Sequence, residues 1–181
     1  MKLSIVIPAH NEEGSIGKTA TELFQSLSNA EIEHEILVVN DNSSDGTEKI
    51  LTDLSHELPS LRFINNTPPN GFGLAVRHGL ENFSGDAVAI VMADGSDAPE
   101  DVIAFFRKIE EGFDCVFGSR FIKNGETQDY PMLKLMLNRL ANQFIRFLFG
   151  IRYNDVTNAF KMYRRETIDG LKPFLSLHFN L

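Results

Sequence analysis

Short apolar runs alternate with amphipathic stretches along the first two thirds of the chain. The apolar runs are rich in valine and isoleucine and predict five strands, at Leu3–Ile7, Glu35–Val39, Leu61–Ile64, Ala87–Met92 and Cys115–Gly118. Between them, apolar residues recur at spacings of three and four, which predicts helices over Gly14–Leu27, Ile50–Leu58, Leu74–Phe83 and Pro99–Glu111. Strands that alternate with helices predict an α/β fold with a mainly parallel, doubly wound sheet.

The pattern changes in the last third of the chain. The stretch Leu133–Phe149 is mostly apolar with interspersed polar residues, and it predicts a long helix. The following residues predict a loop that leads into a strand over Asn154–Tyr163 and a short helix over Glu166–Leu171. The final residues carry no polar tail, so we expect residues 1–181 to be a single domain that is truncated at its C-terminus.

Composition narrows the class of protein. The chain has 181 residues, 43% of them hydrophobic, and a net charge of −8, which argues against a general nucleic-acid binder because phosphate backbones require a basic surface. Its one cysteine, Cys115, can form no internal disulfide, which is typical of a reducing compartment. The sequence contains no apolar run long enough to span a bilayer. We therefore expect a cytoplasmic protein, either peripheral at the cytoplasmic face of a membrane or anchored by segments outside this chain.

The fourth predicted strand ends abruptly in acidic residues. Its apolar run stops at Met92, and Asp94 and Asp97 follow before Pro99 opens a helix. Ligands of open α/β sheets bind at the carboxyl ends of the strands, so both carboxylates are candidate ligands of a metal or substrate. A second interpretation stays open, in which Asp94 merely ends the strand and Asp97 caps the helix.

Polar residues also follow the first and second predicted strands. His10, Asn11 and Glu12 come after the first, and Asn40 and Asp41 after the second. In a parallel sheet these strand ends share one edge, so clusters distant in sequence converge on one site. Arg120, just past the fifth strand, is expected at the same edge, where a bound phosphate ester would require a cation.

Six segments in order resemble one enzyme family. They are Val6–Glu13, Val38–Thr47, Asn70–Ala75, Met92–Glu100, Gly118–Phe121 and Asp155–Lys161. Together they resemble glycosyltransferase family 2 and, within it, the dolichol-phosphate (polyprenyl-phosphate) mannose synthase type. The resemblance implies a GT-A (Rossmann-like) fold, a GDP- or UDP-hexose donor, Mg²⁺ or Mn²⁺, a polyprenyl-phosphate acceptor and inversion at the sugar carbon.

The resemblance also implies roles for individual residues. Pro8, His10 and Glu12 would line the nucleotide, with His10 standing where the family usually has tyrosine. Val39 and Asp41 would contact the base and ribose.

The remaining carried-over roles concern the diphosphate and the acceptor. Met92 and Ala93 would lie against the donor. The implied metal ligands are Asp94, Ser96 and Asp97. The implied catalytic residues are Asp94, Arg120 and Arg139, the two arginines facing the phosphates of donor or acceptor.

Three positions depart from the family pattern. Asn40 replaces the first aspartate of an Asp-Asp pair, Met92 replaces the first aspartate of an Asp-x-Asp motif, and Ser96 stands where glutamine is common. The favoured hypothesis is an inverting, metal-dependent hexosyltransferase acting on polyprenyl phosphate. The alternatives are a non-catalytic nucleotide-sugar-binding domain and a family 2 transferase acting on a saccharide or protein.

The long helix over Leu133–Phe149 carries more apolar positions than one core-facing stripe uses. Arg139 and Arg146 interrupt it seven residues apart, which puts them on one side after two turns. One interpretation places the helix in a membrane interface with Arg139 holding the acceptor phosphate. The other packs it in a hydrophobic core or against a partner chain, with both arginines at the solvent edge.

Overall fold

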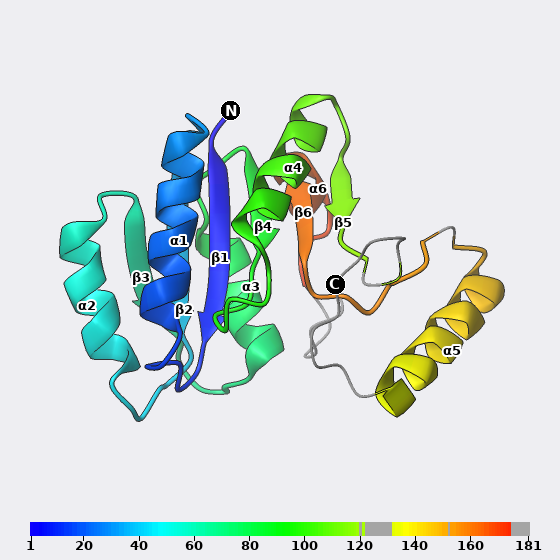
Figure 1. Ribbon diagram of the computed structural model, residues 1–181, viewed down its shortest axis with the longest axis horizontal. Coiled ribbons are helices and arrows are strands. Elements are labelled where there is room, and N and C mark those ends of the chain that lie inside the picture. The colour runs from blue at the N-terminus through cyan, green and yellow to red at the C-terminus, as the bar shows by residue number, and fades with distance from the viewer. Residues whose placement is uncertain (120, 122–131, 152, 175–181) are drawn as a thin grey trace.

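The computed structural model contains a six-stranded sheet between two layers of helices (Figure 1). It describes residues 1–119, 121, 132–151 and 153–174, with only the backbone described at 132–135. The strands are β1 (Leu3–Ala9), β2 (His34–Asn40), β3 (Leu61–Asn65), β4 (Ala87–Ile90), β5 (Cys115–Phe117) and β6 (Lys161–Arg164). The helices are α1 (Ile16–Asn29), α2 (Thr47–Glu57), α3 (Phe72–Asn82), α4 (Pro99–Glu110), α5 (Met132–Phe149) and α6 (Arg165–Gly170).

The sheet has the strand order β3-β2-β1-β4-β6-β5. Strands β1 to β4 pair in parallel, which confirms the predicted mainly parallel α/β sheet. The strand predicted at the end of the stretch Asn154–Tyr163 is β6, and it enters antiparallel between β4 and β5, a place and direction that were not predicted. The chain leaves β5 at the carboxyl edge and returns into β6 from that same edge, so β6 must run the other way.

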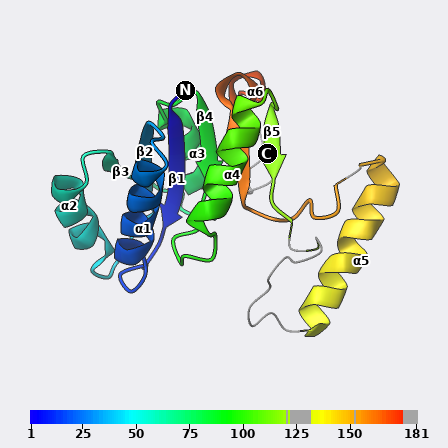
Figure 2. The same ribbon diagram turned by 45° about the horizontal axis from the view of Figure 1, so that its top comes forward.

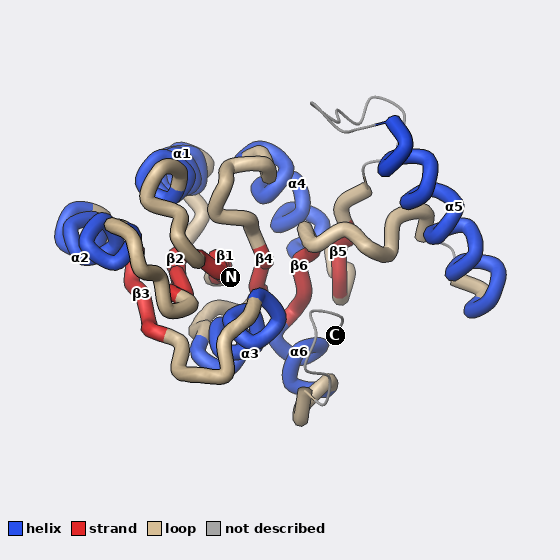
Figure 3. Tube along the Cα trace, turned by 90° about the horizontal axis from the view of Figure 1, so that it is seen from below, coloured by secondary structure: helices blue, strands red, loops and turns tan. Residues whose placement is uncertain are grey.

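The helices cover both faces of the sheet (Figure 3). Helices α1, α2 and α4 lie on one face, and α3 and α6 lie on the other. Successive side chains of a strand point to opposite faces, so Leu3, Ile5 and Ile7 of β1 pack on the first side and Val6 on the second. Both faces of the central strands are therefore core, as their continuous apolar runs predicted.

Helix α3 lies close against β1. A Cβ atom at Gly79 would lie 2.3 Å from Cγ1 of Val6, a distance that no side chain can adopt without moving the helix. Val76 and Leu80, on the adjoining turns, are buried against the same face of the sheet. Glycine at position 79 thus sets the spacing of α3, whose first turn borders the carboxyl edge.

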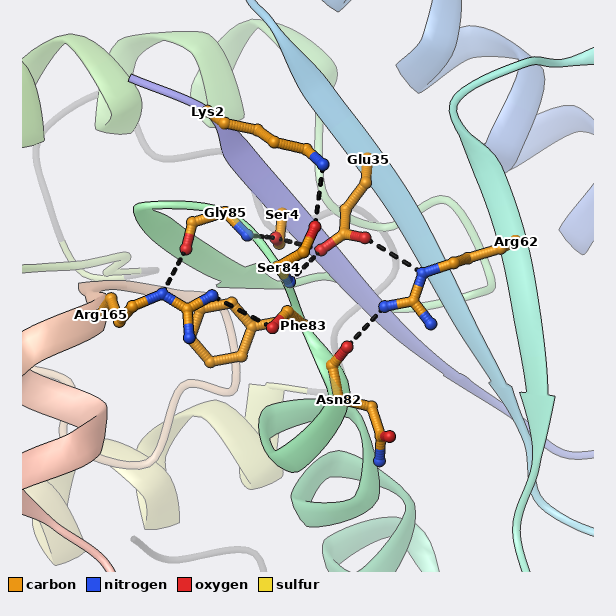
Figure 4. A network of polar contacts seen from close by, with 9 residues as sticks. All are labelled: Lys2, Ser4, Glu35, Arg62, Asn82, Phe83, Ser84, Gly85 and Arg165. Atoms are coloured by element: carbon orange, nitrogen blue, oxygen red, sulfur yellow. Dashed lines mark hydrogen bonds and ion pairs between the residues drawn. The ribbon is translucent and has the colours of Figure 1, made fainter.

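A buried carboxylate fastens the opposite edge of the sheet (Figure 4). Glu35 of β2 is 5% exposed and accepts hydrogen bonds from the Ser4 hydroxyl (2.5 Å), the Ser84 backbone N–H and Nε of Arg62 (3.1 Å). Burial raises the pKa of Glu35, but these hydrogen bonds outweigh it and leave the pKa below its ordinary value. The carboxylate thus links β1, β2 and β3 to the turn before β4.

Arg165 attaches the start of α6 to the same turn (Figure 4). Its Nε donates to the Gly85 carbonyl (2.8 Å), a terminal nitrogen donates to the Phe83 carbonyl (3.1 Å), and the guanidinium lies 4.1 Å from the Phe83 ring centroid. These contacts hold the start of α6 against the turn before β4, at the edge of the sheet opposite the carboxyl edge.

We expect Glu35→Gln to lower the free energy of unfolding at pH 7 by about 1–3 kcal/mol. Whichever way the amide turns, its NH₂ group meets a donor. A group whose folded pKa is depressed stabilises above its unfolded pKa and loses that contribution as pH falls through the folded value. The deficit of the variant should therefore shrink as pH falls through the folded pKa of Glu35, which lies below its ordinary value, because the wild-type carboxyl then also becomes neutral. Urea unfolding at pH 7 and over a series of decreasing acidic pH values tests this, with the exposed Glu57→Gln as control; a deficit that does not change with pH would contradict it.

Candidate active site

The loops after β1 and β2 are tied together through His10. The backbone N–H of Asp41 donates to the Ala9 carbonyl (2.8 Å), and Nδ1 of His10 lies 2.7 Å from the Asp41 carbonyl. Because a carbonyl only accepts, Nδ1 carries the proton, and Nε2 accepts from the Asn11 amide (3.2 Å). Asn11, with φ of 58°, is oriented in turn by the Ser44 N–H (2.8 Å). Both ring nitrogens of His10 are engaged while its side chain stays exposed, which leaves the ring faces as a surface for a ligand.

Glu12 lies in the loop between β1 and α1, beside the loop that precedes α2. Its backbone N–H donates to the Thr47 hydroxyl (2.8 Å), and its carboxylate accepts from the Ser15 hydroxyl (2.6 Å). Asp45 accepts from both the N–H (3.0 Å) and the hydroxyl (2.6 Å) of Thr47. The two loops therefore form one hydrogen-bonded unit at the carboxyl edge.

The acidic loop after β4 folds back on itself. Asp97 accepts from the Met92 N–H (2.9 Å), and Asp94 accepts from the Ser96 N–H (3.0 Å). The interpretation of Asp97 as a helix cap is wrong, because Ala98 is the N-cap residue of α4 and no side chain caps it. Thr19 of α1 is buried and donates to the Ala93 carbonyl (2.9 Å), which joins this loop to the β1 side of the edge.

Asp94 fits a divalent cation that arrives with a diphosphate. Among the residues the structure describes, no three His, Cys, Asp or Glu side chains gather as a ready-made metal site. Mg²⁺ in phosphate-transfer sites commonly takes only one or two carboxylates and completes its shell with water and substrate phosphates. Asp94 is exposed and uses one oxygen for Ser96, so its other oxygen remains available for such a cation.

The carboxyl of Asp97, in the same loop, has a raised pKa. Burial, together with the negative charges of Asp94 and Asp101, raises its pKa to about 6 against the opposing hydrogen bond from Met92. A carboxyl with a raised folded pKa binds more protons when folded than when unfolded, so stability falls as pH rises between the unfolded and folded values. Between about pH 4 and pH 6, ionisation of Asp97 thus costs folding free energy.

We expect Asp97→Asn to raise the free energy of unfolding at pH 7.5 by about 1–3 kcal/mol, because asparagine still accepts the Met92 N–H without carrying a charge. At about pH 4 the two proteins should be equally stable, since wild-type Asp97 is then protonated. Thermal unfolding with EDTA at both pH values measures this. A variant less stable than wild type at pH 7.5 would contradict it.

Helix α5 presents its apolar side to solvent. It stands apart from the two helical layers (Figures 1 and 2), and its exposed side chains include Phe147, which is 90% exposed. The other large exposed apolar side chains of the helix are Met136, Leu137, Leu140, Phe144, Leu148 and Phe149. On its other side Asn142 is 1% exposed, donates to the Thr157 hydroxyl (3.2 Å) and accepts the Val156 N–H (2.7 Å), and Asn138 and Ile145 are partly buried. The interpretation in which this helix packs into a core of its own chain is therefore wrong.

A cationic hollow of about 240 Å³ lies between α5 and the loops at the ends of β5 and β6. It is lined by Phe121, Arg139, Gln143, Arg146 and Asn154. None of the described residues that line it is acidic, and the Arg139 guanidinium lies 5.4 Å from the Phe121 ring centroid. Such a site suits an anion with several acceptor oxygens.

The Asn154 amide is oriented by its neighbour. The Ser119 hydroxyl donates to Oδ1 of Asn154 (2.7 Å) and accepts the N–H of Phe121 (3.1 Å). This fixes the carboxamide, so that its NH₂ group is left as a further donor beside the two arginines. Arg120, expected among these cations, lies outside the described residues.

Comparison with known proteins decides the family. The model of Glycosyl transferase family 2 matches residues 4–171. The chain belongs to this family. Two relatives are each 30% identical: the polyprenol monophosphomannose synthase of Mycolicibacterium smegmatis over 91% of this chain, and the dolichol-phosphate mannosyltransferase of Pyrococcus furiosus over 95%. The chain spans 62% and 49% of their respective lengths.

The solved structures agree on the fold. The glucosyl-3-phosphoglycerate synthase of Mycobacterium tuberculosis, crystallised with Mn²⁺, UDP and phosphoglyceric acid, superposes with a TM-score of 0.68 at 21% identity. The match covers 91% of this chain and 56% of that one. Family 2 membership and this similarity confirm the predicted GT-A fold.

Several positions implied by the family resemblance are buried in this member. The side chains of Pro8, Val39 and Ala93 are buried, so any contact with a nucleotide would come from their backbone. Asn40 is 3% exposed and donates to Oδ1 of Asn65 (2.8 Å). An amide suits this position, because Oδ1 of Asn65 needs a donor while its NH₂ group is used by Glu48 (2.8 Å).

Asp41 is at the predicted edge but is largely occupied by the protein itself. It is 5% exposed, and its two carboxylate oxygens accept from the Asn66 amide (2.7 Å) and the Gly71 N–H (2.8 Å). Sequence reasoning missed Asn66, although a polar residue directly after β3 gives the same signal as those after β1, β2 and β4. It also missed Thr19, whose place in a helix gave no such signal.

Proposed function

We propose that the chain is the catalytic domain of an inverting, metal-dependent glycosyltransferase that moves a hexose from GDP- or UDP-hexose to a polyprenyl phosphate. The observation that carries the acceptor assignment is the cationic hollow beside the exposed apolar face of α5. A lipid phosphate is complementary to both features, because it has a dianionic head and a long apolar tail. The two relatives named for polyprenol and dolichol phosphate support the same substrate class.

The donor would lie across the carboxyl ends of β1, β2 and β4. The exposed ring face of His10 is suited to stack against the nucleoside, and Asp94, with Ser96 and Asp97 beside it, would hold the Mg²⁺ or Mn²⁺ that accompanies the diphosphate. When bound, that cation would supply positive charge to the leaving diphosphate.

The acceptor would sit in the cationic hollow, with its phosphate on Arg139. In the transfer, an oxygen of the lipid phosphate forms a bond to the sugar carbon while the bond from that carbon to the nucleoside diphosphate breaks. A phosphate monoester has a second pKa near ~6 and is largely dianionic at neutral pH, so it needs orienting rather than deprotonating. For this reason we assign no catalytic base.

The apolar face of α5 would rest on the membrane that holds the acceptor. An interfacial helix buries bulky apolar groups at the headgroup boundary and keeps cations beside anionic lipid. None of the helices that the structure describes is both long and apolar enough to cross a bilayer. Contact through the face of α5 would be peripheral.

The test is release of nucleoside diphosphate in the presence of Mn²⁺, with and without polyprenyl phosphate. Release that requires the lipid phosphate supports the proposed transferase. Donor binding in a thermal-shift panel of nucleotide sugars without any release would instead support the non-catalytic alternative, which Met92 in place of an aspartate favours. Release stimulated by a saccharide or protein, and not by polyprenyl phosphate, would support that saccharide or protein as the acceptor instead.

A further inference from the structure

A chain of hydrogen bonds connects helix α3 to Asp41. Nδ1 of His78, on the second turn of α3, lies 3.0 Å from Oδ1 of Asn66. Asn66 donates its amide to one oxygen of Asp41, and Gly71 donates its N–H to the other. The order is therefore His78 to Asn66 to Asp41, with Gly71 closing the far side of the carboxylate.

The donors and acceptors of this chain are fixed by the carboxylate. Asp41 can accept only from the NH₂ group of Asn66, so the amide oxygen of Asn66 must face His78. An amide oxygen accepts, so Nδ1 of His78 carries the proton and donates. The backbone N–H of Asn66 also donates to the Asn40 carbonyl (2.8 Å), which places Asn66 firmly against the end of β2.

Apolar packing holds α3 in place without these hydrogen bonds. Val76, Leu80 and the close approach of Gly79 to Val6 already pack the helix on the sheet. A half-buried apolar side chain at position 78 would extend that packing without hydrogen bonds. What the polar chain adds is a fixed orientation for a buried carboxylate between the loops after β1, β2 and β3.

We propose that His78 and Asn66 are positioning residues for nucleoside recognition, acting through the Asp41 carboxylate. This inference rests on the proposed function, which puts the nucleoside of the donor at this edge. Each Asp41 oxygen retains a lone pair after accepting one protein hydrogen bond, and the orientation of those lone pairs depends on where Asn66 and Gly71 hold the carboxylate. Loss of the His78 bond would let the Asn66 amide turn and the carboxylate shift with it.

The test measures binding of GDP and of UDP, each with MnCl₂, by calorimetry, and of inorganic pyrophosphate with MnCl₂ as a ligand without a nucleoside. We expect His78→Leu to weaken the nucleoside diphosphate that wild type binds by about tenfold and to leave pyrophosphate binding unchanged. His78→Asn, which can place an amide N–H near the position of Nδ1, should restore most of the loss. His56→Leu, on the exposed end of α2, is the matched control.

A double-mutant cycle with Asp41→Asn tests whether the effect passes through Asp41. If it does, His78→Leu should add little to the loss in the Asp41→Asn background, whereas independent roles would give additive losses. Additive losses, an equal loss of pyrophosphate binding, or unchanged nucleotide binding would each overturn the proposal. If wild type binds neither nucleotide, the proposed function itself fails; if wild type binds and His78→Leu binds equally, only the positioning role fails. Should His78→Leu unfold, Asn66→Ala takes its place in the same cycle.

Discussion

Replacing Asp94 with asparagine should severely weaken metal-dependent donor binding. The substitution keeps the size of the side chain and its acceptor for the Ser96 N–H, and removes the exposed negative charge after β4. Because removing even an outer-sphere partner of a metal ligand commonly costs 10–100-fold in affinity, losing the ligand itself should weaken Mn²⁺-dependent binding of a nucleotide sugar by about a hundredfold or more. Calorimetric titration of GDP- and UDP-sugars, with MnCl₂ and with EDTA, measures the effect.

Asp97 is the informative comparison for Asp94. Its carboxylate is half-buried and holds the Met92 N–H, so Asp97→Asn should reduce donor binding less than Asp94→Asn while it stabilises the fold. Comparable losses from both changes would make Asp97 a second metal ligand. Asp53→Asn, an exposed carboxylate on α2, should change nothing. Donor binding by Asp94→Asn with unchanged metal dependence would refute the assignment of Asp94.

The strands β1 to β5 could be predicted from short apolar runs. All five were predicted at the correct places, within two residues of their observed ends, whether the strand is fully buried like β1 or half-buried like β5. Strand β6 was predicted only as the strand at the end of the broad stretch Asn154–Tyr163, without exact bounds, because Lys161–Arg164 is short and has charged residues at both ends. Its antiparallel place between β4 and β5 depends on how the intervening chain returns, which no local pattern encodes.

The candidate site shows the same division between local and long-range information. Residues that follow a strand directly, such as Asp41 and Asp94, could be predicted because strand ends share an edge. The hydrogen bonds of Thr19 and His78 could not be predicted, because each joins a helix residue to a loop that follows a strand, Thr19 to the loop after β4 and His78 to the loop after β3. The orientation of α5 was also beyond prediction, since its many apolar residues suit a core as well as a membrane. The burial of Asn142, with Asn138 and Ile145 partly buried beside it, shows which side faces the protein.

Arg139→Ala should weaken transfer to a lipid phosphate far more than it weakens donor binding. Arg139 lines the cationic hollow on the polar side of α5, away from the acidic loop after β4 that would hold the diphosphate. A charge-assisted hydrogen bond to phosphate contributes about 1.5–3 kcal/mol, so the KM for the lipid phosphate should rise roughly 10–100-fold. Arg139→Lys keeps the charge without the two-pronged geometry and should fall between. Steady-state kinetics with a short, water-soluble prenyl phosphate separates this effect from membrane binding.

Substitutions on the two sides of α5 should then have their effects in different assays, of vesicle binding and of activity on a soluble acceptor. Phe147→Ser removes the most exposed of the large apolar side chains that the structure describes, and it should reduce sedimentation with vesicles while leaving activity on the soluble prenyl phosphate intact. Arg146→Ala should reduce binding to anionic vesicles, with a loss that shrinks at high salt, and because Arg146 also lines the hollow it should raise the KM for the soluble acceptor. If Arg139→Ala instead loses donor and acceptor affinity equally, the arginine is structural or faces the donor. The hollow would then no longer support an acceptor site, and the membrane contact of α5 would rest on its apolar face alone.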